Sequence, residues 1–240
     1  MIKRIEKIEE FEKYKLTDIF SIRIMSLIKA YGTTYDFARF FAQYDESDNI
    51  SSIISCLDSD YTLSHEDNFD SEELNEFFCA VGFSSVLSDD KYMLNEHFTK
   101  GDVMATSSKK ELHVSYAEID EFPRLMDIFN LDDYNETDFE NWYVDASHRI
   151  RHNCAKATAL KINGEIVSSA MLSSIYNDDA ILTAVRTSPE FRGLGYGSAL
   201  VSEMICDVKG KVYLMRESDK NEHFYNNLGF ENCGKWRMFK

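Results

Sequence analysis

A glycine-rich run between an apolar stretch and an amphipathic stretch is the feature of this sequence with the clearest chemical meaning. Three of the ten glycines, Gly193, Gly195 and Gly197, fall within five residues, directly after Arg192. Such a run exposes consecutive backbone NH groups, and at the start of a helix these groups have no partner inside the helix. Together with the helix dipole and the arginine they can hold anionic oxygens. The run from Arg192 to Ser198 is therefore interpreted as a diphosphate site.

The surroundings of this run exclude two common diphosphate motifs. No Gly-Lys-Ser/Thr sequence follows the glycines, so the run is not a P-loop. The acidic residue expected about 20 residues after a Rossmann turn does not lie at the end of a strand. A glycine turn before a helix is also often purely structural, so further residues are needed to identify the ligand.

Two ordered sequence blocks supply them. The spacing Arg-x-x-Gly-x-Gly, together with Pro189, Leu200 and the strand ILTAVRT, resembles the acetyl-CoA signature of the GNAT superfamily of N-acetyltransferases. One strand and one helix later, Phe224–Phe230 (FYNNLGF) resembles the F/L-Y-x-x-x-G-F block of the same family. Alone, the second block would be read as a packed aromatic helix that ends at Gly229. The conjunction of both blocks is far more specific, and the resemblance covers residues 112–240.

The resemblance implies a fold, a cosubstrate and a set of binding residues. It implies an α/β fold, a mixed sheet flanked by helices, with acetyl-CoA as cosubstrate and no metal. The reaction would be direct attack of a primary amine, on a small molecule or a peptide, on the thioester. The alternative is a noncatalytic acyl-CoA-binding sensor. The residues that the resemblance assigns to acetyl-CoA are Val185, Thr187, Arg192, Gly193, Leu194, Gly195, Tyr196, Gly197, Ser198 and Ser218. Ser218 stands where many members have an asparagine.

The implied reaction needs three groups. A backbone NH near Val185 would meet the oxyanion, as in the family. Tyr225 is the candidate acid for the departing thiolate, because a phenol of pKa about 10 and a thiol of about 8.5 are close enough for proton transfer. Asp179, thirteen residues before Arg192, resembles the catalytic glutamate of histone-acetylating members and is the candidate base. The alternatives are that Tyr225 only packs and that Asp179 only closes a turn.

Other residues that could bind metal lack the right pattern. His148 and His152 lie four residues apart on an expected helix, but no HExxH motif and no third ligand accompany them. A solvated helix face is the preferred interpretation, and a place facing the acceptor groove is the alternative. The five cysteines are odd in number and have no CxxC spacing, which favours reduced, mostly buried thiols over a disulfide framework.

The elements that must hold these residues follow from the apolar patterns. In the second half we expect helices, strands and a hairpin turn at Asn163-Gly164. The expected elements are helices 122–129, 139–152, 198–208 and 223–228, and strands 157–162, 166–175, 180–187, 212–216 and 236–239. The first half shows a similar order of helix, strands and helix. Its expected elements are helix 19–30, strands 37–44, 50–57 and 61–63, and a helix that begins at Ser71.

The chain is expected to contain two domains. We place the break in the polar segment Lys100–Lys110, before a strand-like HVSYA, which gives domains of residues 1–105 and 110–240. The first half resembles the degenerate GNAT-like domain of two-domain bacterial members. Where a cofactor turn would lie it has His65–Asp70 (HEDNFD), with negative charge and no glycine, so it is not expected to cradle a pyrophosphate. Its role, as a wall of the acceptor site or as a dimerisation or stabilising domain, is open.

Composition excludes several other classes of protein. The formal charge of −16 over 240 residues argues against nonspecific nucleic-acid binding. No run of about 20 apolar residues and no apolar leader is present, so we expect a cytoplasmic protein with no membrane partner. The expected partners are the amine acceptor and, as one option, a second copy of the chain.

Overall fold

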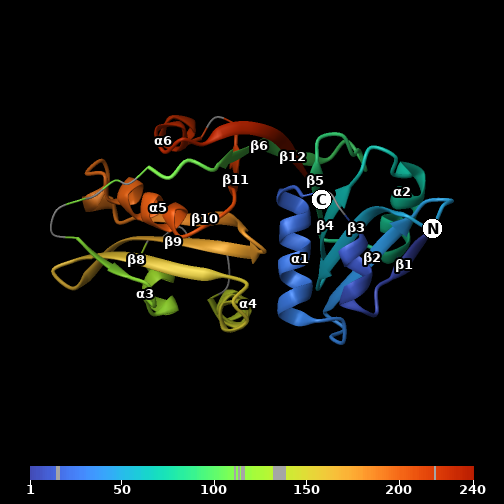
Figure 1. Cartoon of the computed structure of the whole chain (residues 1–240), viewed down its shortest axis with the longest axis horizontal. Helices are drawn as coiled ribbons and strands as arrows, with labels where there is room; N and C mark the ends of the chain where they lie inside the picture. The colour runs from blue at the N-terminus through green and yellow to red at the C-terminus, as the bar shows by residue number, and fades with distance from the viewer. Residues whose placement is uncertain (15–16, 111, 113, 115–116, 132–138, 219) are drawn as a thin grey trace. The chain divides into compact units, whose positions relative to one another are not determined.

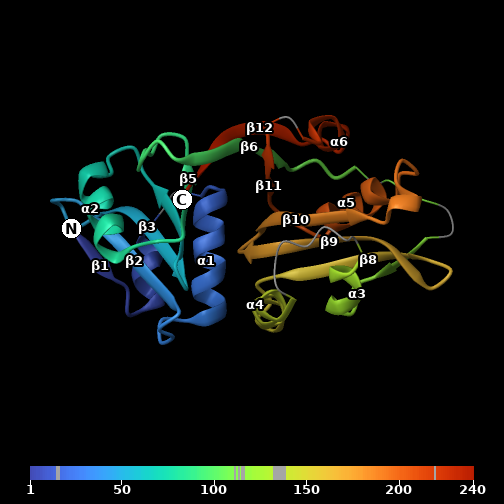
Figure 2. The same cartoon turned by 180° about the vertical axis from the view of Figure 1, so that it is seen from behind.

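The computed structural model describes residues 1–14, 17–110, 112, 114, 117–131, 139–218 and 220–240. The chain divides into two compact units (Figures 1 and 2). Unit 1 comprises Met1–Val103, Met215–Ser218 and Cys233–Lys240, and unit 2 comprises Met104–Leu214 and Asp219–Asn232. No helix in the described part of the chain is long and apolar enough to span a membrane.

Unit 1 is a sheet covered by two helices. Its strands follow the order β1-β2-β3-β4-β5-β12. Neighbours pair antiparallel, except that β4 and β5 are parallel. The elements that begin in this unit are β1 (Ile2–Arg4), η1 (Ile8–Lys13), α1 (Ile19–Tyr31), β2 (Ala38–Tyr44), β3 (Ile50–Leu57), β4 (Asp60–His65), α2 (Ser71–Val81), β5 (Ser85–Asp89) and β6 (Phe98–Thr106).

Unit 2 repeats this arrangement. Its strands lie in the order β11-β10-β9-β8-β7, antiparallel except for the parallel pair β10 and β11. The remaining elements of the chain are β7 (Glu118–Asp120), α3 (Leu125–Phe129), α4 (Phe139–Arg151), β8 (Lys156–Ile162), β9 (Glu165–Tyr176), β10 (Asp179–Thr187), η2 (Pro189–Phe191), α5 (Tyr196–Cys206), β11 (Val212–Glu217), α6 (Glu222–Asn227) and β12 (Glu231–Phe239). In both units two helices lie between the first two strands, η1 and α1 in unit 1 and α3 and α4 in unit 2, and the connection of the parallel pair contains α2 or α5.

Each face of the sheet in unit 2 has its own apolar core. Alternate strand residues point to opposite faces, so a strand buried on both sides contributes to two cores. On one face, side chains of β8–β11 pack against α5, with Leu200 and Phe230 almost fully buried. On the other, Ala157, Ala159 and Met171 pack against α3 and α4. The glycine-rich turn and the helix after it therefore stand on a rigid support.

Most predicted elements are confirmed, and the differences have local causes. The helix expected at 122–129 begins only at Leu125, because the side chain of Asp120 accepts a hydrogen bond from the Phe122 NH and Pro123 follows. The boundary between the two units falls between Val103 and Met104, inside the segment Lys100–Lys110 where the break is expected. This segment is not a polar linker, since β6 runs to Thr106 with Val103 and Met104 buried. The HVSYA segment, 113–117, lies mostly outside the described residues. Most of the last strand, β12, from Cys233 onward, belongs to unit 1, where it pairs with β5.

A crowded contact in unit 1 joins residues from three strands that are far apart in sequence. Trp236 Nε1 of β12 donates a hydrogen bond of 3.1 Å to the carbonyl oxygen of Arg216 in β11. The guanidinium of Arg216 forms a 3.0 Å ion pair with Asp102 of β6. A Cβ atom at Gly101 would overlap the Arg216 carbonyl oxygen and lie 2.7 Å from Trp236 Nε1. Glycine is therefore required at this point.

We predict that Gly101→Ala destabilises the protein by roughly 1–3 kcal/mol or more, because the added methyl group cannot be placed without moving backbone. Denaturant unfolding measures the change. Gly234→Ala on β12 is the matched control, since a Cβ there meets only Val103 at 3.9 Å. Equal stabilities of the two variants would contradict the packing described here.

A buried ion pair fixes the end of β4 in unit 1. His65 Nε2 lies 2.8 Å from Asp89 Oδ1, and Nδ1 lies 3.0 Å from the carbonyl oxygen of Glu66. Both partners only accept hydrogen bonds, so both ring nitrogens donate and the ring is an imidazolium. Burial disfavours the charged ring, but the hydrogen bond and charge of Asp89 outweigh it, and the pKa of His65 is raised. Burial likewise opposes the Asp89 charge, yet His65 keeps the pKa of Asp89 low.

The stabilisation that His65 provides should depend on pH with a defined sign. Because the pKa of His65 is raised in the folded state, its contribution to the free energy of unfolding is complete below about pH 6.5, the pKa of histidine in an unfolded chain. The contribution is lost as pH rises through the pKa of His65 in the folded protein. We expect the difference in unfolding free energy between the native protein and His65→Gln to shrink with rising pH. Denaturant titrations from acid to alkaline pH measure it, and a difference that is constant with pH would refute the imidazolium assignment.

Candidate functional site

The site begins with an irregularity in β10. Thr183 pairs with Met171 of β9, and Arg186 pairs with Ser169, so two residues of β10 lie opposite one residue of β9. Ala184 within this bulge has φ of 52°, a conformation that non-glycine residues rarely adopt. The buried Ser168 hydroxyl holds the bulge by donating to the Arg186 carbonyl oxygen at 2.8 Å. The bulge turns the end of β10 away from the regular ladder.

The two parallel strands separate next to this bulge. β10 and β11 pair only through Ala180 with Val212 and Ile181 with Tyr213. Beyond these pairs β10 continues to Thr187 and β11 to Glu217. Strand separation at the carboxyl ends of parallel strands creates a crevice, which is where α/β sheets bind ligands.

The glycine turn lines this crevice. Gly193 and Gly195 have φ of +77° and +88°, which only glycine adopts without strain. Gly195 is the N-cap of α5 and has no side chain that could accept from the first-turn NH groups. A Cβ at Gly197 would lie 3.0 Å from the Thr187 hydroxyl oxygen, so the third glycine keeps the floor of the crevice clear. The first turn of α5 therefore presents its NH groups to a ligand.

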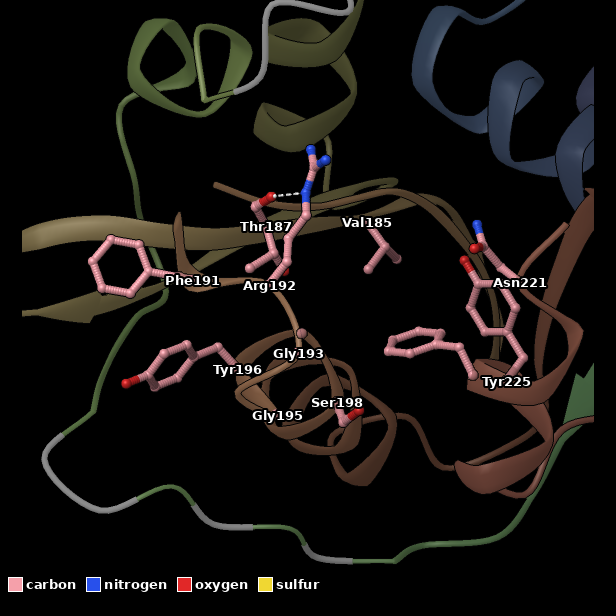
Figure 3. Close-up of a pocket in the computed structure, with 12 residues that line it drawn as sticks. Val185, Thr187, Phe191, Arg192, Gly193, Gly195, Tyr196, Ser198, Asn221 and Tyr225 are labelled. Carbon is pink, nitrogen blue, oxygen red and sulfur yellow. Dashed lines mark hydrogen bonds between the residues drawn. The ribbon is translucent and has the colours of Figure 1, made fainter. Parts of the chain in front are cut away.

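The result is a cavity of about 480 Å³ within unit 2 (Figure 3). It is lined by Val185, Thr187, Phe191, Arg192, Gly193, Gly195, Tyr196, Gly197, Ser198, Asn221, Phe224 and Tyr225. Arg192 Nε donates to the Thr187 carbonyl oxygen at 2.9 Å, which fixes the side chain across the turn. This lining contains one guanidinium and no carboxylate, in a chain of net charge −16. The cavity thus suits an anion.

Tyr225 stands on the opposite side of the cavity from Phe191 and Tyr196 (Figure 3). The ring is held by edge contacts with Phe224 and Phe230, whose centroids are 5.0 Å and 5.7 Å away. Burial raises the pKa of the Tyr225 phenol above its ordinary value. The phenol is therefore protonated at neutral pH and can donate its proton or a hydrogen bond.

The structure brings together most, but not all, of the residues predicted for the site. Those that line the cavity are Val185, Thr187, Arg192, Gly193, Gly195, Tyr196, Gly197, Ser198 and Tyr225. Leu194 is 59% exposed and Ser218 belongs to unit 1, and neither is in the lining. Phe191, Asn221 and Phe224 line the cavity without having been predicted. Phe191 directly precedes the first block and Phe224 is the first residue of the second, so their place in the sequence was the available signal.

The structure does not support Asp179 as a base. It lies at the start of β10, six residues and about 20 Å from Val185 for an extended strand. Its Oδ1 accepts a hydrogen bond of 2.7 Å from the Lys211 NH, and the same oxygen fills the space beside Gly210. The alternative interpretation, a carboxylate that closes a turn, is the one that the contacts fit.

His148 and His152 stack on α4 with ring centroids 4.2 Å apart, and His152 Nδ1 lies 2.9 Å from the His148 carbonyl oxygen. Within the described part of the chain no group of three or more His, Cys, Asp or Glu residues could hold a metal ion. The two histidines are not in the lining of the cavity.

Comparison with known proteins bears on the fold and on the second half of the chain. A sequence model of the acetyltransferase (GNAT) family matches residues 116–230. Similar solved structures include a GCN5-related N-acetyltransferase from Kribbella flavida, with 14% identity, coverage of 92% of this chain and 93% of that chain, and a TM-score of 0.61. No curated protein sequence matches the chain.

Two further structures cover nearly the whole chain. A GCN5-related N-acetyltransferase from Sphaerobacter thermophilus has 11% identity, covers 99% of this chain and 94% of that chain, and has a TM-score of 0.63. A tandem GNAT protein from the clavulanic acid biosynthesis pathway has 10% identity, covers 99% and 97%, and has a TM-score of 0.57. At these identities the likeness concerns the fold.

The cavity geometry predicts that a negative charge at position 197 lowers the affinity for acetyl-CoA. Gly197→Glu would place a side chain against Thr187 and a carboxylate beside the α5 NH groups, and we expect acetyl-CoA affinity to fall about tenfold or more. Isothermal titration calorimetry measures it, with Gly234→Glu in unit 1 as the control for the added charge. Unchanged affinity in a folded Gly197→Glu protein would refute the assignment of the cavity.

Proposed function

Residues 116–230 form a domain of the acetyltransferase (GNAT) family, and on this premise we propose that the protein transfers an acetyl group from acetyl-CoA to a primary amine. The acceptor would be a small molecule or a peptide, attacked directly and without a covalent enzyme intermediate. The observation that carries the proposal is that residues of both sequence blocks, Arg192 to Ser198 and Phe224 to Tyr225, line one cavity.

The residues of the cavity fit a diphosphate-containing cosubstrate. The uncapped first turn of α5 supplies NH donors, Arg192 supplies positive charge, and the lining brings no carboxylate near the phosphates. In unit 1 the equivalent helix α2 differs in one decisive respect. Asp70 is its N-cap, and its carboxylate accepts from the NH groups of Glu72 and Glu73 at 3.0 Å and 3.1 Å. That helix start is satisfied by its own side chain, so only unit 2 is proposed to bind acetyl-CoA.

The bulge in β10 would contribute to the transfer step. As the new N–C bond forms and the C–S bond breaks, negative charge develops on the thioester carbonyl oxygen and then on sulfur. Val185, in the bulge and in the cavity lining, would direct its backbone NH to that oxygen. An NH group fixed by the fold needs no reorganisation during the reaction, which makes it effective in stabilising the developing charge.

Tyr225 would donate the proton that the departing thiolate needs. Its raised pKa keeps the phenol protonated through the neutral range, so the acid form is lost only as pH rises above the ordinary tyrosine range. The amine must also lose a proton, at a cost of about 4.6 kcal/mol for a lysine-like amine at pH 7. We assign no residue of the described lining to that proton, since Asp179 lies elsewhere on the strand.

The experiment that tests the function is a thiol-release assay with acetyl-CoA and a broad panel of primary amines, from polyamines and amino sugars to peptides. Turnover with at least one amine, with the acetylated product identified by mass spectrometry, is the expected result. Tight acetyl-CoA binding with no turnover on any amine would contradict catalysis and favour an acyl-CoA sensor.

Tyr225→Phe separates an acid from a packing residue, because it keeps the ring and removes only the hydroxyl. We expect the rate of the chemical step to fall roughly 10²- to 10⁴-fold, with acetyl-CoA affinity nearly unchanged. Single-turnover kinetics measures the step, and Tyr35→Phe in unit 1 serves as the control. Near-native turnover by Tyr225→Phe would mean that this tyrosine only packs.

A further inference from the structure

Asn221 lines the acetyl-CoA cavity with an amide that does not cap the helix after it. Asn221 directly precedes α6 and is part of the cavity lining. An asparagine at this position of a helix usually has an extended backbone, and its side chain accepts from one of the first NH groups. Asn221 instead has φ of 59°, and its side chain makes no cap hydrogen bond. The amide is thereby left for the cavity.

The Asn221 amide lies at the same end of the cavity as the Tyr225 phenol (Figure 3). The Tyr225 NH donates to the Asn221 carbonyl oxygen at 3.2 Å, so the two residues are one helical turn apart on one face. Phe191 and Tyr196 line the opposite side of the cavity. With Tyr225 at the departing sulfur, as proposed above, Asn221 lies at the reacting end of the cosubstrate.

The two side chains differ in their exposure to solvent. Asn221 is exposed, whereas Tyr225 is half-buried. An acceptor that enters from solvent therefore meets the amide at the rim of the cavity, while the phenol lies deeper. In the tetrahedral intermediate the attacking nitrogen and the sulfur are bonded to the same carbon. A group that contacts the nitrogen must therefore stand close to the group that protonates the sulfur, and Asn221 meets this requirement.

We propose that Asn221 binds the acceptor and selects a primary amine, because its amide oxygen accepts a hydrogen bond from the attacking nitrogen. This inference rests on the proposed acetyl transfer. The nitrogen lone pair forms the N–C bond as the C–S bond breaks. The amine loses one proton to water, Tyr225 gives one proton to sulfur, and solvent restores the phenol. The other N–H of a primary amine remains in the product amide, so its bond to Asn221 persists throughout.

Secondary amines and alcohols lack this persistent donor. Each has only one N–H or O–H hydrogen, and that hydrogen must leave when the product forms. The bond to Asn221 is then lost as the intermediate collapses, and the amide oxygen is left without its partner. Asn221 thus favours primary amines in the transition state and not only in the bound complex, which is the condition for a difference in kcat/KM.

Asn221→Gly tests the selection, because glycine adopts the left-handed backbone without strain and only the amide is removed. The probes are the primary amine with the fastest turnover in the thiol-release panel and its N-methyl derivative. We expect kcat/KM for the primary amine to fall about five- to tenfold and that for the N-methyl derivative to change little. Acetyl-CoA affinity, measured by calorimetry, is expected to stay as in the native protein.

Asn163→Gly is the matched control for the backbone. Asn163 is also an asparagine with positive φ, 52°, but it lies in the turn between β8 and β9 and outside the cavity lining. The same exchange there is expected to leave both values of kcat/KM as in the native protein. Circular dichroism verifies that each variant is folded.

Asn221→Asp adds a test that a purely structural role would not affect. Aspartate also tolerates the left-handed backbone and keeps an oxygen acceptor, but its negative charge stabilises the protonated amine. Because only the neutral amine attacks, the rise of kcat/KM with pH is expected to move to higher pH than in the native protein. The pH profile with the same primary amine measures this shift.

The outcomes separate this inference from the proposed function. A native protein that turns over no amine would overturn both. A native protein that turns over amines, with unchanged selectivity in Asn221→Gly and an unchanged pH profile in Asn221→Asp, would overturn only the role of Asn221. A loss of acetyl-CoA affinity in Asn221→Gly with unchanged selectivity would also overturn it, because Asn221 would then bind the cosubstrate and not the acceptor.

Discussion

The early end of the pairing between β10 and β11 is the constraint on which the site depends. The pairing with β11 ends at Ile181, after two residues in each strand. β10 then bulges at Ala184 and pairs with β9 again at Arg186 and Thr187, while β11 continues to Glu217. The opening between them exposes the end of β10 on one side and the start of α5 on the other. If β10 paired with β11 along its whole length, the cavity would be closed, and the NH groups of the glycine turn would have no space for a ligand in front of them. The positive φ at Ala184 is the local cost of keeping the strands apart.

The two units share one arrangement of strands and helices but differ at the start of the helix that connects their parallel strands. In each, an antiparallel run is followed by a parallel pair whose connection contains a helix, α2 in unit 1 and α5 in unit 2. The start of α2 is capped by Asp70, whereas the start of α5 is a left-handed glycine that caps nothing. Beside the start of α2, Gln43 is buried and also bonds to Asp70 and Glu73. Unit 1 has thus satisfied internally the donors that unit 2 leaves for a ligand.

Unit 1 is completed by strands from distant parts of the chain. β12 pairs with β5, and its Trp236 meets Arg216 and Gly101 from two other strands. The end of β11 belongs to unit 1, while α6 and Tyr225, which come after it, belong to unit 2. Folding of unit 1 therefore requires the carboxyl end of the chain.

The sequence by itself determined most of the local structure and the identity of the main site. Apolar periodicity predicted α1, α4 and α5 and the strands β2–β4 and β8–β12, but not β1, β5, β6 and β7. The family resemblance predicted nine of the residues that line the cavity. These features are local, since glycines at left-handed positions and a helix start act through their immediate neighbours. Spacing alone could not reveal that Asp179 accepts from the Lys211 NH, that Ser218 falls in unit 1, or that β12 pairs with β5. Those outcomes depend on strand register and on pairing between distant segments, which only the tertiary structure decides.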